Sequence, residues 1–158
     1  MPTNLGDGDD IFNGGAGEDN IRGGAGDDTL LGGLNADKLY GQEGDDELQG
    51  GSGGDRLYGG DDEDRIVGGD GNDVLHGDNA GDGDDAEGWS DTFVFDNNDG
   101  NDVVNDFEDD LDEVELTSGG TYSLSYEGNN TVLTYGSTTV TFRGVILEAD
   151  DFSGATLV

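Results

Sequence analysis

Residues 14–31 read GGAGEDNIRGGAGDDTLL, which is a nine-residue unit written twice. The unit has glycine at positions 1, 2 and 4, Asp at position 6 and an apolar residue at position 8. Cutting the chain every nine residues from Leu5 to Val94 gives ten such units. A fixed short period of this kind indicates a repeat architecture in which each unit packs only against its neighbours.

Two positions of the unit carry most of the pattern. Position 6 is Asp in all ten units: Asp10, Asp19, Asp28, Asp37, Asp46, Asp55, Asp64, Asp73, Asp82 and Asp91. Position 8 is apolar in nine of the ten, the exception being Asp84: Phe12, Ile21, Leu30, Leu39, Leu48, Leu57, Ile66, Leu75 and Phe93. Each position of the unit is therefore expected to have one structural role along the whole stretch.

We interpret each unit as a glycine-rich loop followed by a very short strand over positions 7 to 9. Glycine permits the positive φ angles that tight loops need, and side-chain alternation turns position 8 inward. Two units make one 18-residue coil, and stacked coils pair as parallel strands about 4.8 Å apart. The sequence therefore predicts an all-β fold, a parallel β-roll over residues 5–94, with odd-numbered loops along one edge and even-numbered loops along the other.

Several units depart from the pattern. Asn35 and Asp62 replace the glycine at position 4, and Gln42 replaces one at position 2. Asn and Asp tolerate left-handed backbone conformations, so these coils are expected to persist. The ninth unit (residues 77–85) has lost both loop glycines and its apolar anchor, and the tenth keeps only Asp91 and Phe93 of the pattern. Sites built on these two units are expected to be the weakest.

The charge of the chain excludes several kinds of partner. Its 158 residues include 39 Asp or Glu, five Lys or Arg and 32 Gly, for a net charge of −34. This charge argues against nucleic acid and against anionic membrane surfaces, and no apolar run is long enough for membrane insertion as a helix. The absence of cysteine excludes disulfides and thiolate metal sites.

Stacking the coils places the position-6 carboxylates above one another, where they repel. Too few basic residues are present to neutralise them, so a cation is expected between successive loops. Carboxylate and carbonyl oxygens suit Ca²⁺, whereas one histidine and no cysteine serve softer metals poorly. The predicted ligands are the ten Asp residues and carbonyls of the glycine loops, at Gly14, Gly23, Gly32, Gly41, Gly50, Gly59 and Gly68.

The same stacking predicts how many ions bind. Asp10, Asp28, Asp46, Asp64 and Asp82 would share one edge, and Asp19, Asp37, Asp55, Asp73 and Asp91 the other, with four gaps on each. We expect five to eight Ca²⁺ ions. One apolar anchor per nine residues is too little to offset the entropy of ordering the chain, so ion binding is expected to be coupled to folding, a disorder-to-order transition.

The register resembles the calcium-binding nonapeptide repeats of RTX proteins, which include secreted bacterial haemolysins, lipases and serralysin-type proteases. The resemblance covers residues 5–94. It implies a secreted, extracellular protein that uses the type I secretion machinery. The start, MPTNLGDGDD, lacks the basic and apolar regions of a Sec-type signal. The end, EADDFSGATLV, is similar to the loose, uncleaved C-terminal signals of the resembling families.

Residues 95–158 form a second region in this interpretation. The stretch from Asp91 to Leu116 resembles the segment that follows the repeats in serralysin-type proteins, and is expected to close the end of the roll. From Thr121 onward, TYSLSY, TVLTY and TTVTFRGV alternate as strands with EGNN and GS as turns. This predicts a small antiparallel meander that serves for packing.

No catalytic constellation stands out. His76 is the only histidine, and no GxSxG context occurs. We therefore predict a non-enzymatic accessory module of a larger secreted protein. The alternative is a module that binds an anionic polysaccharide, similar to the repeat modules of mannuronan C5-epimerases. Its candidate face consists of outward residues of the even-numbered units: Arg22, Lys38, Tyr40, Arg56, Tyr58 and His76.

Overall fold

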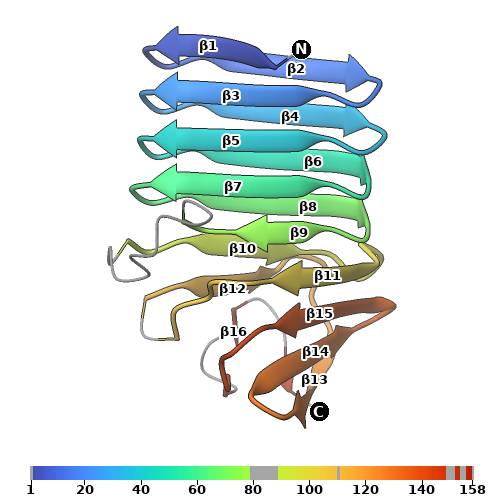
Figure 1. The fold of residues 1–158 in the computed structure, drawn as a ribbon. Helices are drawn as coiled ribbons and strands as arrows, with labels where there is room; N and C mark the ends of the chain where they lie inside the picture. The colour runs from blue at the N-terminus through green and yellow to red at the C-terminus, as the bar shows by residue number, and fades with distance from the viewer. Residues whose placement is uncertain (1, 79–88, 110, 149–151, 154–155, 158) are drawn as a thin grey trace.

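The computed structural model describes residues 2–78, 89–109, 111–148, 152–153 and 156–157. Every regular element among these residues is a β-strand. The first nine strands follow one another at intervals of about nine residues (Figure 1). They are β1 (Thr3–Asp7), β2 (Ile11–Ala16), β3 (Asn20–Ala25), β4 (Thr29–Leu34), β5 (Lys38–Glu43), β6 (Glu47–Gly53), β7 (Arg56–Asp61), β8 (Arg65–Gly71) and β9 (Val74–His76).

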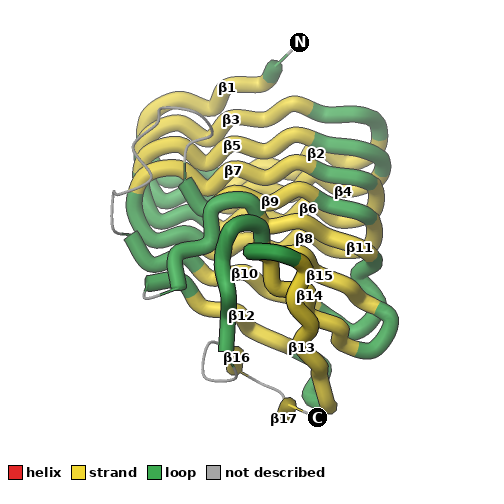
Figure 2. The backbone as a smooth tube through the Cα atoms, turned by 60° about the horizontal axis from the view of Figure 1, so that its bottom comes forward, coloured by secondary structure: helices red, strands yellow, loops and turns green. Residues whose placement is uncertain are grey.

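These strands wind into a parallel roll. Odd-numbered strands β1 to β9 lie side by side in one sheet, and even-numbered strands β2 to β8 in a second. All of their pairings are parallel, as in Ile21↔Leu39 and Leu30↔Leu48. Figure 2 shows the connecting loops gathered along two opposite edges of the stack. The predicted fold class, a parallel β-roll, is confirmed.

The strands are longer than the sequence predicted. Strands β2 to β8 all have six or seven residues, because pairing continues from positions 7–9 into the first glycines of the next unit. In β4, for example, Gly33 pairs with Gly15 of β2 while its φ is 111°. Asn35, Gln42 and Asp62 take φ of 78°, 100° and 79°, so the non-glycine residues keep the loop backbone where glycine is missing.

The core of the roll is two columns of inward apolar side chains, one from each sheet. All of the position-8 residues from the second to the eighth unit are fully buried: Ile21, Leu30, Leu39, Leu48, Leu57, Ile66 and Leu75. At the N-terminal end, Leu5 and Phe12 are partly buried against this core. The inward direction predicted for position 8 is therefore confirmed.

The tenth unit does not lie on the edge that the register predicted. Strand β10 (Thr92–Phe95) pairs directly with β8, with Phe93 opposite Ile66. Asp91 consequently lies above Asp64, on the edge opposite to the one predicted. The reason lies in the ninth unit itself, since Asp84 at position 8 would bury a carboxylate in the apolar core. Residues 79–88, with Asp82 and Asp84, lie outside the described residues.

The C-terminal region continues both sheets past residues 94–95, the predicted limit between the two regions. Strand β11 (Asn101–Val104) pairs with β9, and β12 (Glu113–Leu116) pairs with β10. Strands β13 (Thr121–Glu127), β14 (Asn130–Tyr135) and β15 (Thr138–Phe142) form the predicted antiparallel meander. Strand β15 joins β11, while the short strands β16 (Phe152–Ser153) and β17 (Thr156–Leu157) pair with β12 and β13.

Aromatic side chains fill the end of the roll. Phe107 lies 5.8 Å from Phe93 and 5.2 Å from Phe142 between ring centroids, and Phe95 meets Phe142 edge-on. These contacts close the core with ordinary apolar packing. Separately, the described part of the chain has no helix long and apolar enough to cross a membrane.

Candidate metal centre

The position-6 Asp residues form two ladders, one along each edge of the roll. The first ladder is Asp10, Asp28, Asp46, Asp64, Asp91 and Asp112. The second ladder is Asp19, Asp37, Asp55, Asp73 and Asp102. The structure thus brings together the predicted Asp residues that it describes, with Asp91 moved to the first ladder.

A repeated hydrogen bond fixes each carboxylate. The backbone N–H of one ladder Asp donates to Oδ1 of the Asp in the following coil. Between Asp28 and Asp46 this distance is 2.7 Å, and between Asp37 and Asp55 it is 2.8 Å. From Asp28 and Asp37 onward, Oδ1 of each ladder Asp therefore accepts a hydrogen bond from the preceding coil, and the other oxygen, Oδ2, has a fixed direction.

That second oxygen is buried without a partner. Oδ2 has no hydrogen-bond partner in eight ladder residues: Asp19, Asp28, Asp37, Asp46, Asp55, Asp64, Asp73 and Asp102. Buried polar atoms of folded proteins are satisfied with few exceptions, and a buried charge needs a counter-charge. Two rows of unpaired carboxylate oxygens therefore indicate that the fold includes a positive group that contacts them.

The glycine at position 1 makes room for this carboxylate. A Cβ on Gly32 would lie 2.6 Å from Oδ2 of Asp37 and 2.6 Å from the carbonyl oxygen of Gly50. The same clash with the Asp five residues later, at 2.0–2.6 Å, occurs at all seven predicted glycines: Gly14, Gly23, Gly32, Gly41, Gly50, Gly59 and Gly68. Their role as carbonyl ligands stays a prediction, but the structure gives them a steric role beside the carboxylates.

Burial makes these carboxyls reluctant to ionise without a cation. Desolvation raises the pKa of Asp46 and of Asp73 to about 7, and that of Asp64 to about 9. The backbone N–H that each carboxylate accepts lowers the pKa in part, while the neighbouring ladder carboxylates raise it further. A cation between the loops would reverse this balance, because it favours the charged form.

The oxygen-only chemistry of the ladders fits calcium. No group of three or more acidic, His or Cys side chains suited to a metal occurs in the described residues. A site on a ladder would therefore combine one or two carboxylates with backbone carbonyls, all hard oxygen donors. Ca²⁺ accepts six to eight such ligands in flexible geometry.

Two ladder residues, Asp102 and Asp112, were not predicted as ligands. Asp102 receives the N–H of Asp73 at 2.9 Å, and Asp112 receives that of Asp91 at 3.0 Å. A signal was present, since both begin an Asp-x-Val pattern like positions 6 to 8 of the unit. Their spacing from the preceding ladder residue, 29 and 21 residues, does not fit a nine-residue register.

The sequence profile of the RTX calcium-binding nonapeptide repeat matches residues 5–39 and 40–75. Residues 5–75 belong to the RTX calcium-binding repeats. A comparison with curated proteins finds none that matches the chain.

Two solved structures are similar in fold to most of the chain. One is the extracellular lipase from Serratia marcescens, with 17% identity, a TM-score of 0.39, and coverage of 90% of this chain and 40% of the lipase. The other is a subunit of the Azotobacter vinelandii mannuronan C5-epimerase, with 22% identity, a TM-score of 0.44, and coverage of 92% and 78%. The chain thus spans less than half of the lipase.

The outer face of the odd-numbered RTX strands carries an aromatic column. The rings of Tyr40 and Tyr58 stack 4.9 Å apart, and Tyr58 stacks on His76 at 4.7 Å. The Arg22 guanidinium lies 4.8 Å from the Tyr40 ring centre. His76 Nδ1 lies 3.1 Å from a carboxylate oxygen of Asp106. The remaining predicted face residues, Lys38 and Arg56, are neighbours in the same sheet.

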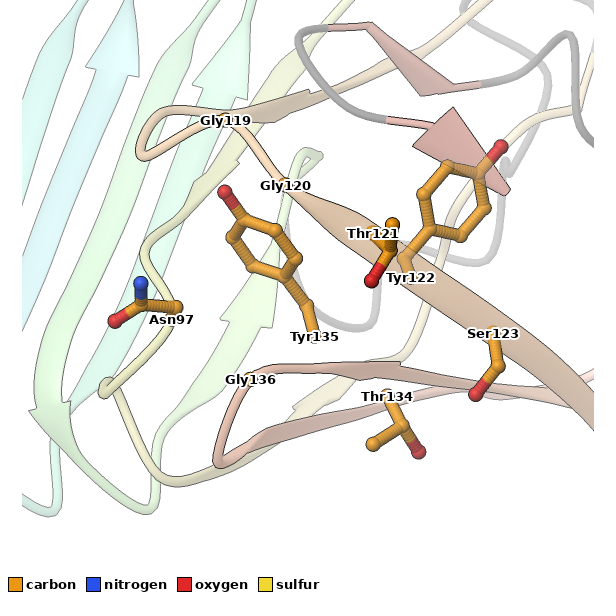
Figure 3. A pocket seen from close by; sticks show the side chains of 9 residues that line it. All are labelled: Asn97, Gly119, Gly120, Thr121, Tyr122, Ser123, Thr134, Tyr135 and Gly136. Atoms are coloured by element: carbon orange, nitrogen blue, oxygen red, sulfur yellow. The ribbon is translucent and has the colours of Figure 1, made fainter. Parts of the chain in front are cut away.

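A separate cavity of about 400 Å³ lies in the meander. Figure 3 shows its lining, with the Tyr135 ring extending from β14 toward the Gly119–Gly120 turn. The Tyr135 hydroxyl is buried without a hydrogen-bond partner, and Asn97 lies across the opening. The cavity has no charged side chain in its lining. It therefore lacks the carboxylate ligands that the ladders offer to a cation.

Proposed function

We propose that this chain is a calcium-dependent folding module of a larger secreted protein, in which the RTX roll orders as Ca²⁺ binds along its two edges. The observation that carries the proposal is the set of buried, unpaired Oδ2 atoms on both ladders. Calcium would supply the missing positive charge there, and the ladder Asp carboxylates with loop carbonyls would hold it. The module has a binding role and no catalytic one.

The number of gaps between successive Asp residues of the ladders sets the number of ions expected. Between Asp10 and Asp64 the first ladder has three gaps, and between Asp19 and Asp73 the second has three. Six ions within the repeats would add twelve positive charges and lower the net charge from −34 to −22. Because each Asp faces both the coil before it and the coil after it, each carboxylate is placed to serve two ions.

Calcium dependence would also serve export. Extracellular calcium modules bind in the range of about 10⁻⁴ to 10⁻³ M, far above the free calcium of a cytoplasm. The chain would stay unfolded inside the cell, pass through the type I secretion machinery, and fold outside. This assigns the module a secretion and folding role for whatever precedes it in the parent protein.

The direct test is circular dichroism of the chain in EDTA and during titration with Ca²⁺, with Mg²⁺ as the control ion. We expect β-structure to appear cooperatively with Ca²⁺ and not with Mg²⁺ at equal concentration. Asp46→Asn should raise the calcium midpoint several-fold and more than Asp10→Asn, because Asp46 lies inside a ladder and Asp10 at its end. Full β-structure in excess EDTA would refute the proposal.

A second candidate function, binding of an anionic polysaccharide such as alginate, rests on the aromatic column. Stacked rings offer flat apolar faces to sugar rings, and Arg22 and Arg56 can pair with uronate carboxylates. The test is NMR titration with alginate oligomers at saturating calcium, read at the unique His76 and at the column tyrosines. Absence of shifts at millimolar oligomer would leave the calcium role alone.

A further inference from the structure

The C-terminal region begins with a second copy of a repeat loop. Residues 70–73 and residues 99–102 share the sequence Asp-Gly-Asn-Asp. The two loops are stacked along one edge of the roll, since Gly71 forms a parallel bridge with Gly100. The Gly71 N–H donates to the Asp99 carbonyl, and the side chain of Asn72 accepts the Asn101 N–H at 3.1 Å. The gap between these loops has the geometry of a gap between repeats.

The acidic groups around this gap are buried, and no basic residue in the described part of the chain forms an ion pair with them. Asp73 is 1% exposed and Asp102 is 2% exposed, and Oδ2 of both is unpaired. Asp99, at position 3 of the second loop, is also buried. The ion pairs near this end of the roll, Arg65–Glu115 and His76–Asp106, involve none of these three carboxylates. A terminal segment whose only task was to cover the core would gain nothing by burying additional carboxylates.

We propose that this junction holds a further Ca²⁺, bound by the Asp73 and Asp102 carboxylates with Asp99 adding charge beside them, and that this ion fastens the C-terminal region to the roll. The proposal rests on the calcium-binding function proposed for the repeats. It extends that function to a segment outside the matched nonapeptide repeats, where the register gives no reason to expect a ligand.

A buried residue of the meander contacts the junction directly. Thr138, at the start of β15, accepts the Asp99 N–H at 2.8 Å and donates to the Asp96 carbonyl at 2.6 Å through the same hydroxyl. Strands β9, β11 and β15 lie side by side here (Figure 1). An ion that fixes the 99–102 loop would therefore fix the edge on which the meander is built.

The test is a count of bound calcium by equilibrium dialysis at saturating Ca²⁺, on the full chain and two variants. Asp102→Asn should bind one ion fewer than the parent chain. Asp96→Asn is the matched control, because Asp96 lies in the same loop but is exposed and off the ladders. Its count should not change. The NMR signal of His76, which contacts Asp106 just after β11, should shift in Asp102→Asn and stay in place in the control.

The outcomes separate the two proposals. If the parent chain binds no calcium, the function proposed for the repeats fails. If it binds calcium and Asp102→Asn binds the same number, only the junction site is overturned. Should Asp102→Asn fail to fold, Asp102→Glu keeps the charge with a longer side chain. That variant is expected to keep the full count but need several-fold more calcium for the last ion, and an unchanged requirement would also overturn the junction site.

Discussion

The odd-numbered strands of the roll and the meander belong to one continuous sheet, but the two regions bury different kinds of side chain. In the roll, each strand contributes one inward apolar residue, and the loops bury carboxylates. In the meander, strands β14 and β15 bury alternate residues with no acid among them: Leu133, Tyr135, Val140 and Phe142. The comparison teaches that hydrogen-bonded strand pairing is common to both regions, whereas the roll buries carboxylates beside its apolar core and these meander strands do not.

The largest expected difference appears when calcium is removed. In EDTA, amide protons of β3 to β8 should lose most of their protection from hydrogen exchange, because the carboxylates repel without ions. Amides of β13 to β15 should stay better protected, since their burial is apolar. Hydrogen exchange followed by mass spectrometry measures both, with restored calcium as the control. Equal loss in the two regions would show that they share one source of stability.

Acid should act on the roll in opposite directions with and without calcium. Without calcium, burial raises the pKa of Asp46 and Asp73 to about 7 and that of Asp64 to about 9, from 3.8. The folded state then binds protons more tightly than the unfolded chain. Its stability is therefore greatest below about pH 4 and falls as the pH rises, by about tenfold in the folding equilibrium per group and pH unit, until about pH 7 for Asp46 and Asp73 and about pH 9 for Asp64.

In EDTA, circular dichroism should thus show more β-structure at pH 5 than at pH 8. With calcium present the sign reverses, because protons compete with the ion for the same carboxylates, and the calcium midpoint should rise as the pH falls. Strands β14 and β15 of the meander, which contain no acidic residue, serve as the internal control. A pH-independent spectrum in EDTA would contradict the assignment of the ladders as the sensitive groups.

A pair of alanine substitutions tests the steric part of the comparison. In Gly50→Ala the new Cβ would lie 2.5 Å from Asp55 Oδ2 and 2.6 Å from the Gly68 carbonyl oxygen. In Gly54→Ala its nearest neighbour would be the Asn72 carbonyl oxygen, at 3.4 Å. We expect the first to lower the free energy of unfolding in saturating calcium by about 2–3 kcal/mol and the second by much less. Thermal unfolding measures both, and equal losses would argue against close packing at the ladder.

The smallest effect is expected at the ion pair between the roll and β12. Arg65 and Glu115 lie 2.6 Å apart, with side chains 41% and 39% exposed. Water screens such a pair, so Arg65→Gln should change stability by less than about 1 kcal/mol, and less still at high salt. Unfolding at low and high salt tests this. A larger loss would mean that the pair, rather than apolar contact and ions, holds the C-terminal region in place.

The sequence predicted the roll because its period is strict. Asp at position 6 and an apolar residue at position 8 define loop, strand and inward face, and the structure agrees on all three from Asp19 to Leu75. The meander was predictable from the alternation after Thr121. The strand lengths were not, because glycines that look like loop residues continue the pairing in the structure, as Gly33 does.

The edge occupied by Asp91 could not be read from the register. A nine-residue period tells which position of the unit a residue occupies. It does not tell on which of the two edges the unit lies, because that depends on how many units precede it in the stack. Asp102 was missed for a related reason, since its 29-residue separation from Asp73 falls outside the phase. In both cases the position of the Asp depends on which coils contact each other, and the local sequence pattern does not give this information.

The 18-residue register also governs how such a chain can change length. Between Asp10 and Leu75, every ladder hydrogen bond joins residues 18 apart, and the inward residues of neighbouring coils pair at the same distance along the chain. A deletion or duplication of 18 residues would therefore leave each remaining coil with neighbours of the same kind. A change of nine residues would exchange the two edges for everything downstream. Growth of the gene by unit pairs is thus neutral for the fold, and growth by single units is not.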